Sequence, residues 1–165
     1  MIYVALLRGI NVGGNNRIDM KELKKSFENA GMNHVKTYIN TGNIIFKDDH
    51  HDKPELVSIL EKAICDDFNL NIRVVVRSLD DMQKVAQALP EHWKNDKEMK
   101  SDVLFLWEEI DDEAVLEKLM VNPEADKVIY VPGAVLWSVD RKNYNKSGMN
   151  KLIGTPVYKL VTVRN

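Results

Sequence analysis

The strongest constraint on the fold is an order of apolar patterns that occurs twice along the 165 residues. In residues 1–77 the pattern predicts a strand, a helix, a hairpin of two strands, a second helix and a fourth strand. Residues 101–165 repeat that order, although the two halves show no convincing sequence identity. This order is that of a ferredoxin-like unit. The sequence therefore predicts an α+β fold with duplicated βαββαβ units in one chain, each an antiparallel sheet with helices packed on it.

The strand patterns also predict the order of the strands within the first sheet. Residues 2–7 (IYVALL) and 44–46 (IIF) are continuously apolar, as in central strands that are buried on both faces. Residues 35–40 and 72–77 alternate, which favours edge strands. A ferredoxin-like sheet has its first and third strands in the centre, so the two observations agree. In the second half we expect strands at 102–107, 127–131, 134–139 and 158–163.

Helix boundaries follow from capping residues and from the spacing of apolar side chains. Asp19 offers an N-cap with Glu22 three residues later, and Pro54 opens a second helix. Ser78 caps a third helix, which leads into a polar connector. We therefore expect a first half at 1–77, a helix plus connector at 78–100, and a second half at 101–165 with helices at 111–120 and 147–153.

Composition excludes several classes of protein. The net charge is −2, so there is no overall basic field of the kind that nucleic-acid binders carry. Cys65 is the only cysteine, which fits a reducing cytosol, and its apolar neighbours at helical spacing predict a small core residue. The N-terminus lacks the basic stretch of a signal peptide, and no apolar run approaches the roughly 20 residues of a membrane helix. We expect a cytoplasmic protein without a membrane partner.

No constellation of residues predicts catalysis, a cofactor or a metal. The stretch DDHHD (48–52) places two histidines between carboxylates, but adjacent side chains point apart, and we interpret it as a solvated connector. Motifs of zinc proteases, thiol redox sites and nucleophile elbows are absent. Whether the chain is an enzyme stays open.

The stretch RGINVGGNNRIDM (8–20) has the most unusual composition, and topology places it beside TGN (41–43) at one end of the first sheet. A glycine-rich backbone that leads into a helix N-terminus suits an anion. Arg8 and Arg17 would add charge, and arginine can make forked hydrogen bonds to phosphate or carboxylate. The same glycines and asparagines also suit any loop that visits positive φ, and the stretch lacks the P-loop and GxGxxG endings. The ligand-binding hypothesis names Arg8, Gly9, Asn11, Gly13, Gly14, Thr41, Gly42 and Asn43.

A second candidate is the locally basic segment RKNYNKSGMNK (141–151), where Arg141, Lys142, Lys146 and Lys151 surround Tyr144. Basic residues interleaved with an aromatic one can bind a phosphate backbone and stack a base, although such a run is more often a solvated loop. The second half also carries strand aromatics that resemble a stacking face, for which core packing is the better interpretation. They are Phe105, Trp107, Tyr130 and Trp137.

Two of these motifs carry a family resemblance. ALLRGINVGG together with YINTGNIIF closely resembles the DUF1697 family of bacterial proteins, and the likeness extends to YNKSGMNKL (144–152) and TVRN (162–165). The resemblance implies a duplicated ferredoxin-like fold and no assigned activity. It adds Ser147, Arg164 and Asn165 to the marked positions. In similar sequences a further helical segment follows the RN pair, so this chain resembles either a truncated or a shortened member.

Our leading hypothesis from the sequence is a cytosolic protein that binds a small anionic or nucleotide-like ligand at the loop and the TGN hairpin. The alternatives are an RNA- or DNA-binding module and a structural or interaction module without a ligand. The module for nucleic acid would use a secondary basic site at Arg141, Lys146, Ser147, Lys151 and Arg164. The sequence leaves the oligomeric state open.

Overall fold

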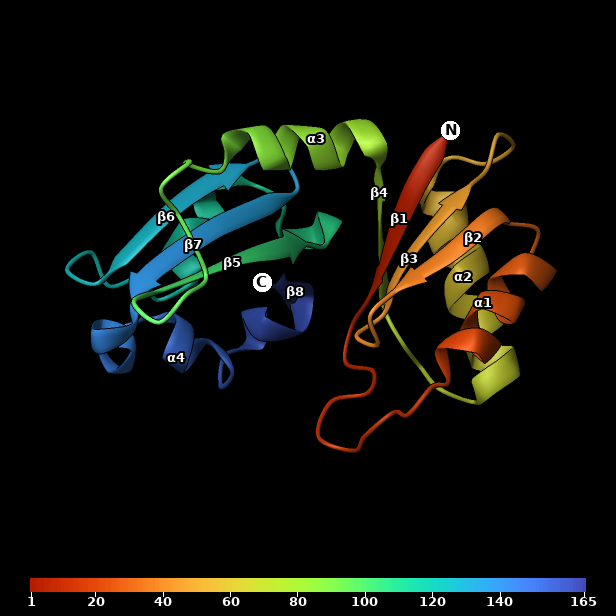
Figure 1. Ribbon diagram of the computed structural model, residues 1–165, viewed down its shortest axis with the longest axis horizontal. Coiled ribbons are helices and arrows are strands. Elements are labelled where there is room, and N and C mark those ends of the chain that lie inside the picture. Colours follow the sequence, from red (N-terminus) through yellow and green to blue (C-terminus); the bar gives the residue numbers. More distant parts are fainter. The chain divides into compact units, whose positions relative to one another are not determined.

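The computed structural model describes residues 1–165, and its helices and strands are labelled in Figure 1. The chain divides into two compact units, unit 1 at Met1–Met82 and unit 2 at Gln83–Asn165. Each unit contains one four-stranded sheet. The boundaries that we expect from sequence at residues 77 and 100 stay a prediction.

Unit 1 has the strand order of a ferredoxin-like sheet. Its strands are β1 (Ile2–Leu7), β2 (Asn33–Tyr38), β3 (Asn43–Lys47) and β4 (Val74–Ser78). They lie in the order β2-β3-β1-β4 with every pair antiparallel, so the first and third strands are central, as predicted. The alternation predicted for β4 is not seen in its burial, because three consecutive valines, Val74, Val75 and Val76, are all buried.

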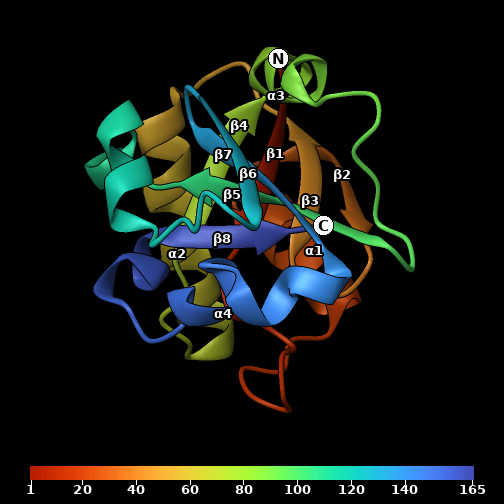
Figure 2. The ribbon, with the colours of Figure 1, turned by 90° about the vertical axis from the view of Figure 1, so that its left-hand side faces the viewer.

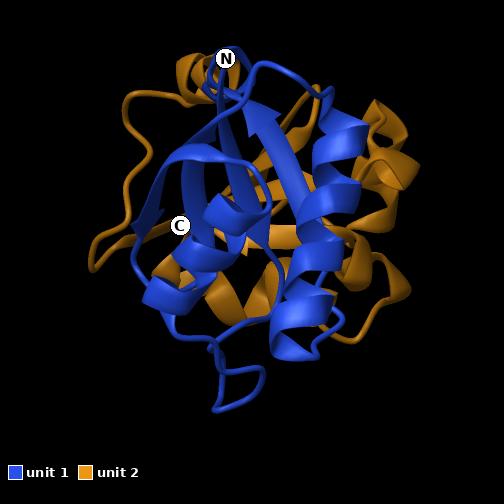
Figure 3. Cartoon of the chain, turned by 90° about the vertical axis from the view of Figure 1, so that its right-hand side faces the viewer, with its two compact units in different colours: residues 1–82 blue, residues 83–165 orange.

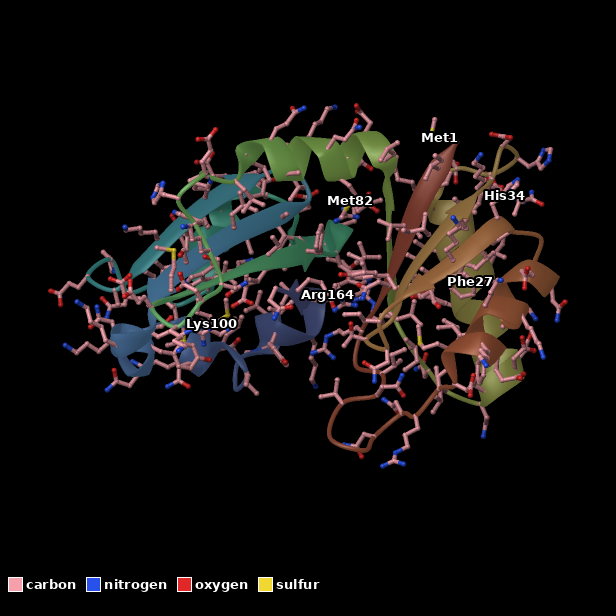
Figure 4. All side chains as sticks on the ribbon, viewed as in Figure 1. Met1, Phe27, His34, Met82, Lys100 and Arg164 are labelled. Carbon is pink, nitrogen blue, oxygen red and sulfur yellow. The ribbon has the colours of Figure 1, made fainter.

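Two helices, α1 (Met20–Asn29) and α2 (Lys53–Phe68), cover one face of this sheet (Figure 1). Both follow an aspartate cap. The Asp19 side chain, the predicted cap, accepts hydrogen bonds from two amides, and Asp52 forms a reciprocal capping box with Glu55 just before Pro54, where the second helix was predicted to open. The Phe27 side chain lies between α1 and the sheet (Figure 4), where its ring meets that of Phe46 edge to face with centroids 6.2 Å apart. Alternate residues of the strands complete this core.

Cys65 is not the core residue that its helical spacing predicts. The structure places it on the exposed side of α2. The buried stripe of that helix consists of Leu56, Leu60 and Ile64. One residue further along a helix is about 100° further around it, so position 65 turns away from the core that position 64 enters.

Unit 2 repeats the strand order of unit 1. Its strands are β5 (Met99–Leu106), β6 (Asp126–Val131), β7 (Ala134–Asp140) and β8 (Val161–Arg164), in the order β6-β7-β5-β8 (Figure 2). All three pairs are antiparallel, and Gly133 closes the predicted β6–β7 hairpin with φ 89°. The fold is therefore α+β with two ferredoxin-like arrangements, as the sequence predicts.

The helical elements of unit 2 are shorter than predicted. The segment expected as one helix at 111–120 contains a 3-10 helix at Glu113–Lys118, and another 3-10 helix, Glu108–Ile110, precedes it. The Asp111 carboxylate accepts hydrogen bonds from the Tyr130 hydroxyl (2.7 Å) and the Gly133 amide (2.8 Å), which holds residue 111 at the hairpin instead of in a helix. Met120, at φ 57°, ends the segment.

The C-terminal helix and strand are also shorter than predicted. The helix predicted at 147–153 is the single turn α4 (Met149–Leu152), and a 3-10 helix (Arg141–Lys146) precedes it. The last strand begins at Val161 instead of residue 158, because a 3-10 helix occupies Pro156–Leu160. Proline fits the first turn of a helix, where no amide hydrogen is needed, so Pro156 favours this outcome.

Helix α3 (Leu79–Ala88) spans the boundary between the two units that Figure 3 colours separately. Its start is a reciprocal cap: the Ser78 hydroxyl accepts from the Asp81 amide (3.1 Å), and the Asp81 carboxylate accepts from the Ser78 amide (2.9 Å). Lys53 of α2 also donates to Asp81 at 2.7 Å. The helix start is thus tied to unit 1 by side chains. No helix in the structure has both the length and the apolar character needed to span a membrane.

Gly42 provides a test of the packing at the end of this sheet. A Cβ at Gly42 would lie 2.7 Å from the Leu7 Cβ, and the residue has φ 90°. We expect Gly42→Ala to lower the free energy of unfolding by about 2 to 4 kcal/mol, from backbone strain plus overpacking. Gly13→Ala is the matched control, because Gly13 has φ 59° but no atom within 4 Å of its Cβ position. It should cost only about 1 kcal/mol in urea denaturation, and equal losses would show that the Leu7 contact does not matter.

Candidate functional site

The glycine-rich loop after β1 is a miniature hairpin. The Asn15 amide donates to the Val12 carbonyl (3.0 Å), and the Asn11 amide donates to the Asn16 carbonyl (3.2 Å). Gly13 and Gly14 occupy the two turn positions with φ 59° and 78°. Two consecutive positive φ values are those of a type I′ turn, which glycine adopts without strain. The turn therefore explains the pair of glycines.

Asn11 joins this loop to the neighbouring segments. Its side-chain amide donates to the carbonyls of Asn40 (2.7 Å) and Ile18 (3.1 Å), and its side-chain oxygen accepts from the Ile18 amide (2.8 Å). One carboxamide thus connects the loop, the β2–β3 turn and the residue before the cap of α1. The predicted convergence of the loop and the TGN hairpin is confirmed by these contacts.

The other predicted site residues of the β2–β3 turn also have roles within the fold. The Asn43 side chain donates to the Tyr38 carbonyl (3.2 Å) and to the Thr41 hydroxyl (3.0 Å). The Gly42 carbonyl accepts from the Leu7 amide (2.8 Å). These bonds close the hairpin and anchor it to the end of β1. Thr41, Gly42 and Asn43 therefore position the turn that carries Asn40.

A pocket of about 390 Å³ opens where these segments meet. The residues that line it are Asn11, Gly14, Arg17, Ile18, Asp19 and Asn40. Arg17 is exposed and forms no ion pair, and its guanidinium lies 3.7 Å from the Cβ position of Gly14. Asp19 also faces the pocket, but one of its oxygens accepts from the amides of Lys21 (2.8 Å) and Glu22 (3.3 Å).

Arg8 and Gly9, which the sequence analysis placed in the site, do not line this pocket. Arg8 is half-buried, and its amide donates to the Arg73 carbonyl (3.1 Å). The Gly9 carbonyl accepts from the Asn16 side chain (3.0 Å). The cation that the structure brings to the pocket is Arg17, which the sequence analysis noted in the loop but did not name as a site residue.

A family model described as a protein of unknown function, DUF1697, matches residues 1–137 of the chain. The chain belongs to the DUF1697 family. Among solved structures it is similar to "conserved bacterial protein SP0830 from Streptococcus pneumoniae", with 30% sequence identity and a TM-score of 0.85. That alignment covers 99% of this chain and 92% of the other. No curated protein matches the chain.

In this DUF1697 protein the Ser147–Gly148 pair of the C-terminal motif is buried around Asp126. The Asp126 carboxylate accepts from the Ser147 hydroxyl (2.6 Å), the Gly148 amide (2.8 Å) and the Asn122 amide (2.9 Å). Burial would raise the pKa of Asp126, but these three hydrogen bonds outweigh it and hold the pKa below its ordinary value. A Cβ at Gly148 would lie 2.0 Å from the Met120 carbonyl oxygen. Both residues are therefore fixed by packing.

The remaining basic residues near this motif are dispersed. Lys146 and Lys151 are exposed, and Arg141 uses its Nε to donate to the Asp96 carbonyl (2.5 Å). Arg164 is partly buried on β8, where it donates to the Thr162 hydroxyl (2.6 Å), and burial lowers its pKa. Three of the four aromatics that the sequence analysis interpreted as core residues are buried: Phe105, Trp107 and Trp137 are 3%, 5% and 1% exposed. The fourth, Tyr130, is half-buried.

The DDHHD stretch contains one buried group that the sequence analysis did not anticipate. Asp48 is 2% exposed and accepts from the amides of His50 (3.0 Å) and His51 (2.8 Å). The His51 ring lies 3.1 Å from its second oxygen. Burial would raise the pKa of Asp48, but its bonds with the His51 ring and with these amides hold the pKa below the ordinary value. Asp48 is thus a structural anchor for the β3–α2 connection, not a solvated residue.

The depressed pKa of Asp48 predicts a stability change in acid. The contribution of Asp48 is present above the ordinary carboxyl pKa and is lost as the pH falls through the lower folded value. In urea denaturation between about pH 7 and pH 3, the wild-type chain should exceed Asp48→Asn in free energy of unfolding at neutral pH, and the difference should shrink below about pH 4. Glu91→Gln, at an exposed residue outside this connection, is the control. A difference that stays constant with pH would show that ionisation of Asp48 does not contribute.

Proposed function

We propose that unit 1 binds a small anionic ligand, such as a nucleotide or a phosphorylated metabolite, in the pocket between the β1–α1 loop and the β2–β3 turn. The observation that carries the proposal is an exposed arginine, Arg17, that lines a preformed pocket of about 390 Å³ and has no carboxylate partner. Pockets of small-molecule sites range from about 300 to 1,000 Å³, so this one suits a compact ligand.

The polar groups around Arg17 support an anionic ligand with hydrogen-bonding capacity. Gly14 lines the pocket, and its amide makes no hydrogen bond within the chain. A free amide beside a guanidinium is an arrangement that binds phosphate or carboxylate oxygens. The oxygen of Asp19 that makes no bond to the α1 amides would accept a hydrogen bond from a hydroxyl or amino group of the ligand.

The remaining site residues position these groups. The side-chain amide and oxygen of Asn11 are both used in hydrogen bonds to Asn40 and Ile18, so the role of Asn11 is to fix the shape of the pocket. A preformed site pays less conformational entropy on binding than a loop that must first become ordered. We place this binding in the cytosol, in keeping with the single exposed cysteine.

The test is a thermal-shift screen with nucleoside phosphates, sugar phosphates and inorganic phosphate. A ligand present at about one hundred times its Kd stabilises the folded chain by about 2.7 kcal/mol, which gives a measurable rise in Tm. We expect Arg17→Ala to remove that rise while its own Tm without ligand stays near the wild-type value, because Arg17 is exposed.

Arg8→Ala is the matched control, because it removes a nearby arginine that does not line the pocket. Each variant is compared with its own unliganded Tm, so a structural effect of Arg8 does not enter the comparison. If Arg8→Ala abolished the ligand shift and Arg17→Ala preserved it, the pocket would be the wrong site. If no anion shifted the wild-type Tm, the proposal as a whole would fail.

A further inference from the structure

The charges of unit 1 are segregated between its sheet and its helices. Its acidic residues all lie in the ranges 19–28, 48–67 and 80–81, which hold the helices and their caps. The ranges 1–18, 33–47 and 68–79 contain the four strands and have no aspartate or glutamate. These three ranges carry six cationic side chains: Arg8, Arg17, Lys36, Lys47, Arg73 and Arg77. The strands of unit 1 and the segments beside them are therefore cationic, although the whole chain has a net charge of −2.

Lys36 and Lys47, the cations of β2 and β3, lie on the sheet face that the helices do not cover. Val35, Ile44 and Phe46 point into the core with the helices. Since successive side chains alternate between faces, Lys36 and Tyr38 of β2 lie on the other face. So do Asn43, Ile45 and Lys47 of β3. Figure 4 labels His34 near the start of β2, which locates this part of the sheet.

The register arranges these residues as neighbours. Lys36 is directly opposite Ile45, and Tyr38 is directly opposite Asn43. Directly opposed side chains have Cβ atoms about 5 Å apart, and diagonal neighbours lie about 7 to 8 Å apart. Tyr38 is thus diagonal to Ile45, and Lys36 is diagonal to Lys47. An aromatic ring, an aliphatic side chain and two ammonium groups form one continuous surface, which we call the β2–β3 face.

The β2–β3 face is open to solvent. Tyr38 is 65% exposed and Ile45 is 42% exposed, while both lysines are exposed and form no ion pair. The β2–β3 face of unit 1 thus presents an exposed tyrosine beside two lysines that form no ion pair.

We propose that the β2–β3 face binds single-stranded nucleic acid. The Tyr38 ring stacks a base, Ile45 supports the neighbouring apolar contact, and Lys36 and Lys47 contact phosphates on either side. Single strands are bound without a sequence code by this combination of a stacking aromatic and a cationic track. The proposal does not rest on the anion pocket, because the two surfaces share no residue.

Charge and edge geometry favour a nucleic acid over a protein strand as the occupant. A protein partner that paired with the edge of β2 would need a regular strand, whereas β2 has a register irregularity between Asn33 and Lys36 and a positive φ of 51° at His34. Bulges and lysines are features that discourage pairing at a sheet edge. Apolar contact alone would suit a protein, but two lysines without any acidic neighbour on the surrounding strands complement a polyanion.

The experiment is fluorescence anisotropy with the full chain and a fluorescein-labelled oligo-uridine RNA of about ten nucleotides, a length within the usual range of such sites. The wild-type chain should bind at about 50 mM salt and weaken steeply towards about 200 mM salt. Lys36→Glu combined with Lys47→Glu should weaken binding at least about tenfold and reduce the slope of log K against log salt by about 1.4, which corresponds to two phosphate contacts.

Tyr38 separates stacking from charge. Tyr38→Ala should weaken binding by about fivefold or more with the salt slope unchanged, because a lost stack carries no counterion effect. Tyr38→Phe keeps the ring and should bind like the wild-type chain. Because Tyr38 is exposed, neither substitution should impair folding. Circular dichroism of Tyr38→Ala and Tyr38→Phe checks this directly.

Lys142→Glu combined with Lys146→Glu is the matched control, because it makes the same charge change at exposed residues of the basic 141–151 segment. It should retain binding to within about twofold. Absence of binding by the wild-type chain at low salt would overturn the proposal. So would wild-type affinity in Tyr38→Ala, or a loss in the control pair as large as that in the Lys36 and Lys47 pair, which would assign the binding to residues 141–151 instead.

Discussion

The arrangement at the end of the first sheet depends on the side chain of Asn11. A carboxamide has both donors and acceptors, and Asn11 uses both kinds: it donates to Asn40 and Ile18 and accepts from Ile18. An aspartate could not replace it, since a carboxylate would face two carbonyl oxygens with no hydrogen to donate. The backbone at Asn11 has φ 54°, a conformation that asparagine tolerates better than most residues. Both the chemistry of the side chain and its backbone preference therefore select asparagine at this position.

Much of the fold could be predicted from sequence because it rests on periodic patterns. The apolar runs of β1 and β3, the cap at Asp19 and the helix start near Pro54 depend only on residues a few positions apart, and the structure has them where they were expected. Asp48, Asp111 and Asp126 could not be predicted in the same way. Asp111 and Asp126 each accept an amide hydrogen from a residue 22 positions further along the chain, Gly133 and Gly148, and such contacts leave no period in the sequence. Asp48 accepts from the nearby amides of His50 and His51, but its burial depends on tertiary packing. The shortened helices of unit 2 are one result of these contacts.

The candidate site shows the same division. Topology alone predicted that the loop and the TGN hairpin would meet, and Asn11 joins them. The choice between Arg8 and Arg17 depended on the turn type at Gly13–Gly14, which decides where the chain returns. That signal was available, because two glycines between short extended segments are a known mark of a two-residue hairpin. The separation of acidic from basic residues is also present in the sequence. It indicates a cationic surface only once the strands are known to lie in one sheet. Whole-chain net charge averages such surfaces away.

Asp126 has a consequence for local unfolding in unit 2. Its carboxylate bonds residues before the β6–β7 hairpin, at Asn122, to residues after it, at Ser147 and Gly148. The chain between them is a closed loop that is held by hydrogen bonds to one ionised oxygen pair instead of by a covalent cross-link. Opening that loop breaks all three hydrogen bonds at once and exposes two buried donors, so the hairpin and the α4 turn should exchange their amide hydrogens as one cooperative segment. In a chain with a single cysteine, a carboxylate takes the place that a disulfide often has in closing a loop.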